Sequence, residues 1–538
     1  MVKKVNDLIK KIVFVSKLTN IGRKKLRIIL SIGLSNISIG LDIIIIIIFS
    51  NLIIGETSYS NSFVKTSIEI ILNNKWMLPL LVIARFLFLF IERINLEYLS
   101  LDVQQNLKLH LMKESFGIGN MSTADIHFFT GQVSVHIATF YKTFAFAINS
   151  FLQVLVYSIF LLFTELELFT YFMIGAILLA FPSRVLLGKA KHYQHLSFNS
   201  SKKLSSKIQR IIDNVILINI LKTSDYEFNE LNTNLEEFKN AQKKNVGFGS
   251  VNSLIPSFFT VLTLSIIFLN FEIAQSVTLE FVAVLIRLFQ SLGSLNNGIG
   301  LTLNSGVHVE EMFNLQINKP VHNLNNLVVD EELSSAVKFQ NLSFKYFNSD
   351  ELIFDNQSIE FEKNKHTVVT GPNGSGKSTL LGLVSGLYVP ISGKSVKYTN
   401  KVGYVGVTPL VFEGSIRDNL MYGNDIKIKD EKLVSMLEDF NFYNDKKINL
   451  DDNISNRSLS SGQLQKISFI RCLLNDSSML LLDESMSNLD TSSKRHIFDV
   501  LNEKNVTIIN CTHNISDFEF DYHLKITVEN ENRILNFI

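Results

Sequence analysis

Long apolar segments separated by polar stretches make up the first 300 residues of the chain. The hydrocarbon core of a bilayer is about 30 Å thick, so a helix needs roughly 20 consecutive apolar residues to cross it. The clearest run is Ile43–Ile48, six consecutive isoleucines inside a longer apolar stretch. We therefore predict membrane-spanning helices near residues 28–54, 76–97, 140–163, 168–189, 250–272 and 277–300.

Two polar segments between these spans keep a helical spacing of apolar residues. They cover residues 98–139 and 190–249, and the second contains Ile208, Ile211 and Ile212 at spacings of three and four. We expect spans two to five to continue as helices beyond the membrane. The alternative, two inserted domains, is disfavoured because each segment is short and poor in glycine.

Composition divides the chain into a helical membrane part and a soluble part. With 538 residues the chain is too long for one core, and its net charge of +1 gives no indication of nucleic-acid binding. Both cysteines, Cys472 and Cys511, lie in the soluble part and suit a reducing compartment. We expect a six-helix transmembrane domain over residues 1–315, a linker over 316–335 and a soluble domain over 336–538.

The distribution of basic residues predicts the orientation in the membrane. Lysines and arginines crowd the segment before the first span and the long segment between spans four and five, whereas acids follow spans three and five. Basic loops remain on the cytoplasmic side. We therefore expect an integral protein of the plasma (inner) membrane whose N-terminus and soluble domain are cytoplasmic.

A glycine-rich segment after a short apolar run carries the clearest chemical signal. It fits the phosphate-binding P-loop pattern, with a predicted strand before it and a helix after it. Its backbone N–H groups would surround a phosphate, its lysine would neutralise the β- and γ-phosphates, and its first hydroxyl would hold Mg²⁺. The candidate ATP-binding residues are Gly371, Asn373, Gly374, Ser375, Gly376, Lys377, Ser378 and Thr379.

A second apolar run ends in two acids about a hundred residues later. Residues 478–484 predict a buried strand that delivers Asp483 to Mg²⁺ and Glu484 to the attacking water. A further strand over 506–510 precedes His513, which would donate to the γ-phosphate. Taken alone, His513 is also compatible with an ordinary surface histidine.

The segment Leu459-Ser460-Ser461-Gly462-Gln463 resembles the Leu-Ser-Gly-Gly-Gln signature of ATP-binding cassette (ABC) transporters. The whole chain, six spans and then one cassette, is similar to half-size ABC exporters. The resemblance implies an α/β P-loop ATPase domain that hydrolyses ATP with Mg²⁺ to drive transport. It also implies roles for further residues: Tyr346 stacks on adenine, Ser460, Gly462 and Gln463 close on the nucleotide of a partner subunit, and residues 487–490 form a D-loop.

Two segments depart from the pattern of this family. Where the family has Gly-Tyr-Val-Pro-Gln, the chain has Gly403-Tyr404-Val405-Gly406-Val407, so the glutamine that contacts Mg²⁺ is a valine. Ser461 replaces the first signature glycine. Slow or substrate-gated hydrolysis and harmless drift are both compatible with these changes.

The resemblance also places coupling helices near residues 123–132 and 214–227. In the first of them, Phe128 and Phe129 either dock in a groove of the ATPase domain or lie buried between helices. Because one cassette supplies only half of each ATP site, the partner is expected to be a second copy of the chain or a related half-transporter.

Three charged residues fall inside the predicted spans and mark a candidate substrate cavity: Asp42, Arg85 and Arg287. At about 1.5 Å per residue they share a level near the middle of the bilayer. Their excess positive charge favours an anionic or amphipathic substrate. The alternative is that Asp42 and an arginine form an ion pair that only stabilises the structure. We expect an ATP-driven exporter or flippase; an ATP-gated regulatory or channel-like protein is the second hypothesis.

Overall fold

The computed structural model consists of two compact units, one over residues 1–117 and 121–319 and one over 118–120 and 320–538. The structure describes residues 2–54, 74, 76–117, 123–164, 166–269, 279–317, 326–346, 351–407, 410–424, 428–443, 448–456, 458–486, 489, 491–503, 505–515, 519–529 and 532–538.

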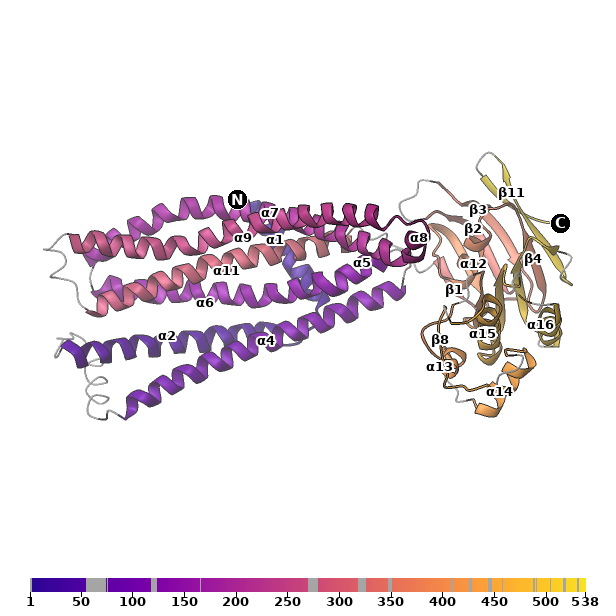
Figure 1. Cartoon of the computed structure of the whole chain (residues 1–538), viewed down its shortest axis with the longest axis horizontal. Coiled ribbons are helices and arrows are strands. Elements are labelled where there is room, and N and C mark those ends of the chain that lie inside the picture. The colour runs from indigo at the N-terminus through magenta and orange to yellow at the C-terminus, as the bar shows by residue number, and fades with distance from the viewer. Residues whose placement is uncertain are drawn as a thin grey trace. The chain divides into compact units, whose positions relative to one another are not determined.

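The described part of the first unit consists of helices joined by short turns, and each of its six longest helices covers most of one predicted span (Figure 1). Residues 270–272 and 277–278 of the predicted spans lie outside the described residues. They are α2 (Lys24–Ile54), α4 (Met77–Gly117), α6 (Ser134–Thr164), α7 (Leu166–Asp213), α9 (Ser224–Leu269) and α11 (Leu279–Ile317). The shorter elements are α1 (Val2–Leu18), α5 (Thr123–Phe128), α8 (Val215–Ile220) and a π-helical turn at Phe129–Val133. Within the described residues, Lys24–Ser50 and Ala124–Phe163 are apolar and long enough by themselves to cross a membrane.

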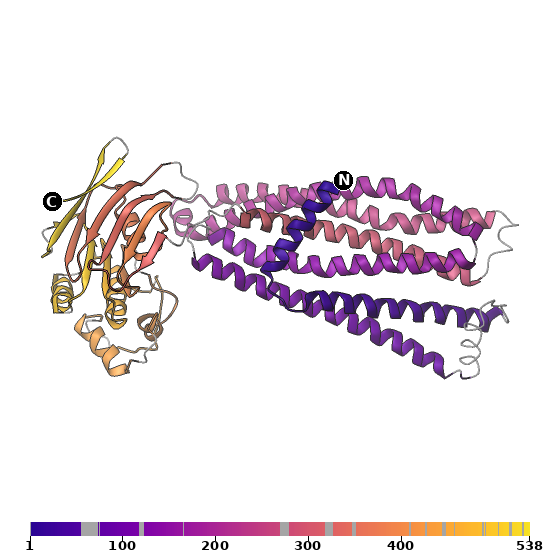
Figure 2. The same ribbon diagram turned by 180° about the vertical axis from the view of Figure 1, so that it is seen from behind.

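The predicted helical extensions are confirmed: α4 continues to Gly117 and α7 to Asp213, beyond their apolar halves, and α6 and α9 begin at Ser134 and Ser224, before theirs. Polar side chains join neighbouring helices where apolar packing alone would not fix their register. Asn245 on α9 donates to the carbonyl of Ala190 on α7 at 2.8 Å, and Asn95 on α4 donates to Ser31 on α2 at 2.8 Å. Figure 2 shows α1 crossing the long helices, where Lys11 pairs with Glu310 on α11 at 2.7 Å.

The two phenylalanines of the first expected coupling helix are buried inside the helical unit. Phe128 and Phe129 are 2% and 3% exposed and pack edge to face against each other, with Phe198 of α7 beside Phe128. The hypothesis that they dock in a groove of the ATPase domain is therefore wrong. In the second expected coupling helix, α8, Leu217 and Ile220 are instead exposed.

The described part of the second unit contains two large sheets and one two-stranded sheet. A four-stranded sheet has the order β1 (Leu327–Val329), β5 (Ser392–Lys397), β2 (Val337–Phe344) and β3 (Phe354–Phe361). A six-stranded sheet has the order β12 (Asn532–Phe537), β11 (Tyr522–Glu529), β4 (His366–Thr370), β10 (Thr507–Cys511), β9 (Met479–Asp483) and β6 (Val402–Val405). A two-stranded pair joins β7 (Gly414–Ser415) and β8 (Asn453–Ile454), and the helices are α12 (Lys377–Ser385), α13 (Ile416–Met421), α14 (Asp430–Asp439), α15 (Ser461–Leu474) and α16 (Thr491–Glu503).

The folded part of this unit begins earlier than the sequence indicates. Leu327–Val329 falls within the expected linker of residues 316–335, yet it forms β1 and pairs in parallel with β5. Asn326 also donates to the carbonyl of Pro390 at 3.0 Å. Three residues are too few to give a periodic signal, which is why the pattern of the sequence did not reveal this strand.

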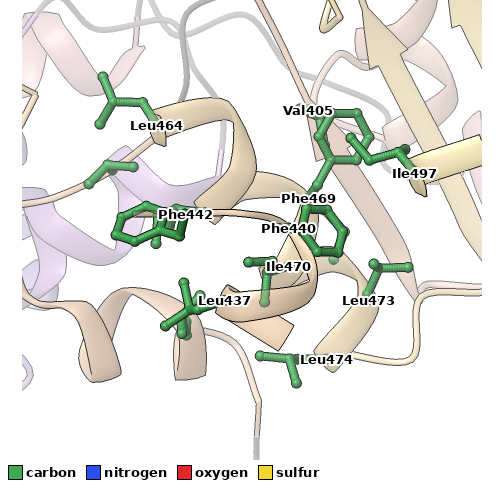
Figure 3. Close-up of a cluster of buried hydrophobic side chains, with 14 of the residues drawn as sticks. Val405, Leu437, Phe440, Phe442, Leu464, Phe469, Ile470, Leu473, Leu474 and Ile497 are labelled. Atoms are coloured by element: carbon green, nitrogen blue, oxygen red, sulfur yellow. The ribbon is translucent and has the colours of Figure 1, made fainter. Parts of the chain in front are cut away.

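Two hydrophobic cores hold the second unit together. In one core, Leu380, Leu381 and Val384 of α12 pack against side chains from both large sheets. The other joins β6 and β9 to α13, α14 and α15, with Val405, Phe440 and Phe469 among its members (Figure 3). The P-loop helix and the signature helix α15 therefore belong to different cores.

Candidate functional site

The candidate catalytic residues follow strands of one parallel array. β4, β10, β9 and β6 are neighbouring parallel strands, so their carboxyl ends meet at one edge of the sheet. The P-loop follows Thr370 of β4, and Glu484 follows Asp483 of β9. His513 follows β10, and Gly406 follows β6. The fold thus brings together groups that lie more than a hundred residues apart in the sequence.

The P-loop requires glycine at particular positions. Gly374 and Gly376 have φ angles of +78° and +97°, a region that other residues rarely adopt. A Cβ on Gly371 would lie 2.7 Å from Ser375 Oγ and 2.8 Å from the carbonyl oxygen of Ile526. Ser375 Oγ is buried and, among the described residues, has no hydrogen-bond partner. These features make a tight loop with its backbone amides available for a phosphate.

The polar residues of the P-loop lie around this turn. Lys377 begins α12, is 7% exposed, and donates to the carbonyl of Gly371 at 3.0 Å. Asn373 and Ser378 are exposed. Ser378 and Asp483 offer a hydroxyl and a carboxylate, the oxygen ligands that Mg²⁺ prefers, so the donor set fits this ion.

Tyr346 lies beside the P-loop helix. Its hydroxyl is 2.6 Å from Thr379 Oγ1, and its ring packs edge to face against Phe344 and Tyr388. Tyr346 is 39% exposed, so part of its ring is accessible to a base. Burial raises the pKa of the neighbouring Tyr388.

Glu484 and His513 form a close pair at the sheet edge. His513 Nε2 lies 2.8 Å from Glu484 Oε1, and the Glu484 amide donates to the carbonyl of Cys511 at 2.9 Å. Glu484 has a φ of +48°, an uncommon left-handed conformation that is frequent at functional sites. Asp483 is 6% exposed. The expected roles of these residues stay predictions, but their proximity makes joint action on one phosphate possible.

Sequence analysis missed a contact of Asp483. Tyr404 on β6 donates from its hydroxyl to Asp483 Oδ2 at 3.5 Å. Burial, with the charge of Asp483 beside it, raises the pKa of Tyr404 to about 12, so the phenol remains protonated at neutral pH. The pairing of β6 with β9, which no local pattern reveals, is what brings these two side chains together.

The signature residues form the N-terminus of α15. Ser460 Oγ accepts from the amide of Gln463, and Gln463 Oε1 accepts from the amide of Ser460. This capping box holds the first turn in place, and the remaining free N–H groups of a helix N-terminus attract anions. Gly462 lies in the same turn. Ser461 is exposed and helical, so glycine's conformational freedom is not required at this position.

Residues 354–487 match the family model described as "ABC transporter". This segment of the chain is thus similar to the ATPase domain of ABC transporters. ABC transporter B family member 22 of Arabidopsis thaliana is 34% identical over 193 residues, which cover 32% of this chain and 16% of that protein. An export ATP-binding/permease protein of Rickettsia felis is 26% identical over 380 residues, covering 62% of this chain and 64% of that protein.

A solved structure of a bacterial Atm1-family ABC exporter with ATP bound has the same fold. It covers 94% of this chain and 93% of its own, with a TM-score of 0.73 and 17% identity. The predicted fold, a helical membrane-type domain followed by an α/β ABC ATPase domain, is thereby confirmed. The chain spans about a sixth of the length of the plant relatives that it matches.

In the helical unit, the three charged residues that were predicted to lie inside the membrane come together. Arg85 Nη2 lies 3.1 Å from Asp42 Oδ1, and Arg287 Nε lies 3.2 Å from Asp42 Oδ2. Tyr157 on α6, which sequence analysis missed, donates to Asp42 Oδ2 at 2.9 Å. Asp42 is 5% exposed, whereas both arginines are partly accessible.

These residues line a pocket of about 200 Å³. Ile39 and Leu89 are its apolar lining residues, and the other ten described lining residues are polar or charged: Ser35, Ser38, Asp42, Arg85, Gln153, Tyr157, Arg287, Gln290, Ser291 and Ser294. Its described lining has two cations and one anion, an excess of one positive charge. A second, largely apolar pocket of about 440 Å³ lies between α7, α9 and α11, with Arg184 and Lys191 among its lining residues.

Of the expected D-loop, Ser487, Asn488 and Asp490 lie outside the described residues. Val407, at the position of the family's glutamine, is described and is 48% exposed. Its apolar side chain therefore reaches solvent at the same sheet edge as Asp483.

Proposed function

We propose that this chain is one half of an ATP-driven exporter that hydrolyses ATP at sites shared between two subunits. The observation that carries the proposal is the sheet edge at which the P-loop, Asp483 and the Glu484–His513 pair come together. The exporter fold of the whole chain supports coupling of this ATPase to transport. Closure of two ATPase domains on ATP, followed by release, would shift the helical domains between two populations of conformers.

The residues at the sheet edge divide the chemistry between them. Lys377 and the P-loop amides bind the β- and γ-phosphates, and Tyr346 stacks on the adenine. Ser378 and Asp483 would hold Mg²⁺, which supplies charge neutralisation at the phosphates. Glu484 orients the attacking water, and His513 donates to the γ-phosphate while its ring is held by Glu484.

Replacing Glu484 with glutamine tests the proposed hydrolysis. Glu484→Gln keeps the shape of the side chain but removes the charge that orients water, so ATP hydrolysis should be lost while ATP binding remains. Phosphate release and equilibrium binding of a fluorescent ATP analogue, measured on purified protein in nanodiscs, give the two readouts. Wild-type turnover no higher than that of Glu484→Gln would contradict the proposal.

The partner in this proposal is a second copy of the chain or a related half-transporter. α12 and α15 belong to separate cores of the ATPase domain, which supports a site completed by the signature of another subunit. The basic segments of the helical domain, the N-terminus among them, are proposed to face the cytoplasm together with the ATPase domain, in the plasma membrane.

The substrate is proposed to be a small amphipathic molecule with an anionic group, moved out of the cytoplasm or between leaflets. A charged residue in the middle of a bilayer costs about 2.5–3.5 kcal/mol on insertion scales, so two arginines there need a compensating anion. Asp42 compensates one of them. Among the described residues, buried Nε of Arg85 has no hydrogen-bond partner. An entering carboxylate or phosphate would supply the second negative charge and accept this hydrogen bond.

Single-chain amphiphiles that differ only in their head group test this proposal. In proteoliposomes, a dodecyl phosphate should stimulate ATP hydrolysis, whereas dodecanol and dodecyltrimethylammonium should not. Arg287→Ala should raise the concentration of dodecyl phosphate needed for half-maximal stimulation roughly tenfold or more, because it removes a charge-assisted hydrogen bond. Asp42→Asn should lower this half-maximal concentration, because the Asp42 carboxylate competes with the substrate's anionic group for both arginines.

Arg184→Ala is the matched control, because Arg184 lines the other pocket of the helical domain. It should leave the response to dodecyl phosphate unchanged. If Arg184→Ala abolishes stimulation and Arg287→Ala does not, the substrate site lies at the other pocket. Basal ATP hydrolysis in the same samples keeps the test independent of the proposed catalytic roles.

A further inference from the structure

Two departures from the family pattern lie next to each other after β6 and have a common structural consequence. Gly406 stands where the family has proline, and Val407 stands where it has glutamine. A Cβ on Gly406 would lie 2.5 Å from the hydroxyl oxygen of Tyr404 and 2.8 Å from its Cε1. The ring of Tyr404 thus occupies space that any other residue at position 406 would need.

The position of this ring determines what Tyr404 contacts. The chain runs from Tyr404 to Gly406 at the end of β6, beside the end of β9, and the tyrosine hydroxyl points to Asp483 Oδ2 at 3.5 Å. Tyr404 is 40% exposed, so its hydroxyl lies at the boundary between the buried carboxylate and solvent. With proline at position 406 the ring would be displaced from Asp483.

The side chain at position 407 cannot hydrogen-bond to Asp483 or to a metal-bound water. Valine has neither donor nor acceptor, so it provides no hydrogen bond to a metal-bound water or to a carboxylate. Carboxylates that ligate metals are commonly held by a second hydrogen bond, and losing that bond weakens metal affinity roughly 10- to 100-fold. A chain with Val407 therefore needs another group to orient Asp483.

We propose that Tyr404 is the positioning residue of the ATP site, its hydroxyl orienting Asp483 in place of the missing glutamine, and that Gly406 is the glycine that permits it. The inference rests on the proposed binding of ATP with Mg²⁺ and adds a residue to it. The two departures are then one compensated exchange: glycine makes room for the tyrosine, and the tyrosine replaces the glutamine.

The test measures how much Mg²⁺ is required for tight nucleotide binding, not turnover alone. All variants carry Glu484→Gln so that ATP is retained, and binding of a fluorescent ATP analogue is titrated with Mg²⁺. Tyr404→Phe should raise the half-maximal Mg²⁺ concentration roughly tenfold or more while leaving metal-free nucleotide binding unchanged. Gly406→Ala should have a similar effect, and the double variant little more than either single change, because both remove the same hydrogen bond.

Tyr398→Phe is the matched control. The hydroxyl of Tyr398 donates to the carbonyl of Ser478 at 2.7 Å, just before β9, whereas Tyr404 contacts the other end of that strand. It should leave the Mg²⁺ requirement unchanged. Val407→Gln added to Tyr404→Phe should lower the half-maximal Mg²⁺ concentration again, at least part of the way to the value of the parent protein.

The outcomes separate this inference from the proposed function. If the parent protein binds no nucleotide, the proposed function fails. If it binds nucleotide in a Mg²⁺-dependent manner and Tyr404→Phe leaves the Mg²⁺ requirement unchanged, only the role of Tyr404 is overturned. An equal effect of Tyr398→Phe would also overturn it, because the loss of any strand-anchoring hydroxyl would then be sufficient.

Discussion

Individual residues of the P-loop are constrained by backbone contacts more than by side-chain chemistry. Gly371 precedes the residues that are proposed to surround a phosphate, yet it faces the backbone of β11, where the carbonyl oxygen of Ile526 leaves no room for a Cβ. A strand in a sheet cannot shift without breaking its ladder, whereas a serine side chain can rotate. The Ile526 carbonyl is therefore the contact that makes glycine necessary.

Gly371→Ala should reduce ATP affinity roughly tenfold or more and destabilise the ATPase domain by about 1–3 kcal/mol, because the added methyl overpacks against β11. Equilibrium binding of a fluorescent ATP analogue and thermal unfolding are the measurements. Adding Ser375→Ala removes the side-chain contact but not the backbone contact, so the double variant should keep the defect. Recovery of affinity in the double variant would show that Ser375, and not β11, sets the limit.

At the scale of elements, the local sequence pattern predicted those helices and strands that local interactions determine. The strands at 366–370 and 479–483, the P-loop helix and the helical extensions follow from periodicity and from glycine placement. The contact of Tyr404 with Asp483 depends on the pairing of β6 with β9, and β1 depends on its pairing with β5. Such pairings join distant segments, so the sequence contains no local signal for them.

The two expected coupling helices illustrate the same limit. Both carry large apolar residues, and sequence alone left open whether those near residue 128 are buried or dock elsewhere. The structure buries Phe128 against Phe198 but leaves Leu217 and Ile220 of α8 exposed. Phe128 ends α5, which continues through a π-helical turn into α6. α8 is instead a short separate helix between α7 and α9.

Phe128→Ala should therefore act on stability. Removing a fully buried phenylalanine costs about 3–5 kcal/mol, so the helical unit should unfold at a lower temperature in detergent. Phe228→Ala is the matched control, because this residue of α9 is 69% exposed and its truncation should cost less than about 0.5 kcal/mol. Equal melting temperatures for the two variants would contradict the burial of Phe128.

At the scale of the whole molecule, the decisive property is that each chain supplies one P-loop and one signature. The signature begins α15, whose side chains pack with α13 and α14, whereas the P-loop helix packs between the two sheets. If each ATP site joins the P-loop of one subunit to the signature of the other, two different defects complement each other only when they lie in different subunits.

Dimers purified through two different tags allow this arrangement to be tested directly. Lys377→Ala disables the P-loop, and Gly462→Asp places a negative charge against the γ-phosphate; an aspartate in the first turn of a helix is favourable to the helix itself, so α15 should remain folded. A dimer with Lys377→Ala in one subunit and Gly462→Asp in the other confines both defects to one site and leaves the second intact. Its ATP hydrolysis should be about half of the wild-type rate per dimer.

The matched control carries the same two substitutions in one subunit, with a wild-type partner. In that dimer each site has one defect, so hydrolysis should be close to zero although the number of altered residues is identical. A site contained within a single chain predicts the reverse order, because the wild-type subunit would then retain its full activity. The comparison thus depends only on how the P-loop and the signature are distributed between subunits, which is the arrangement that the proposed dimer requires.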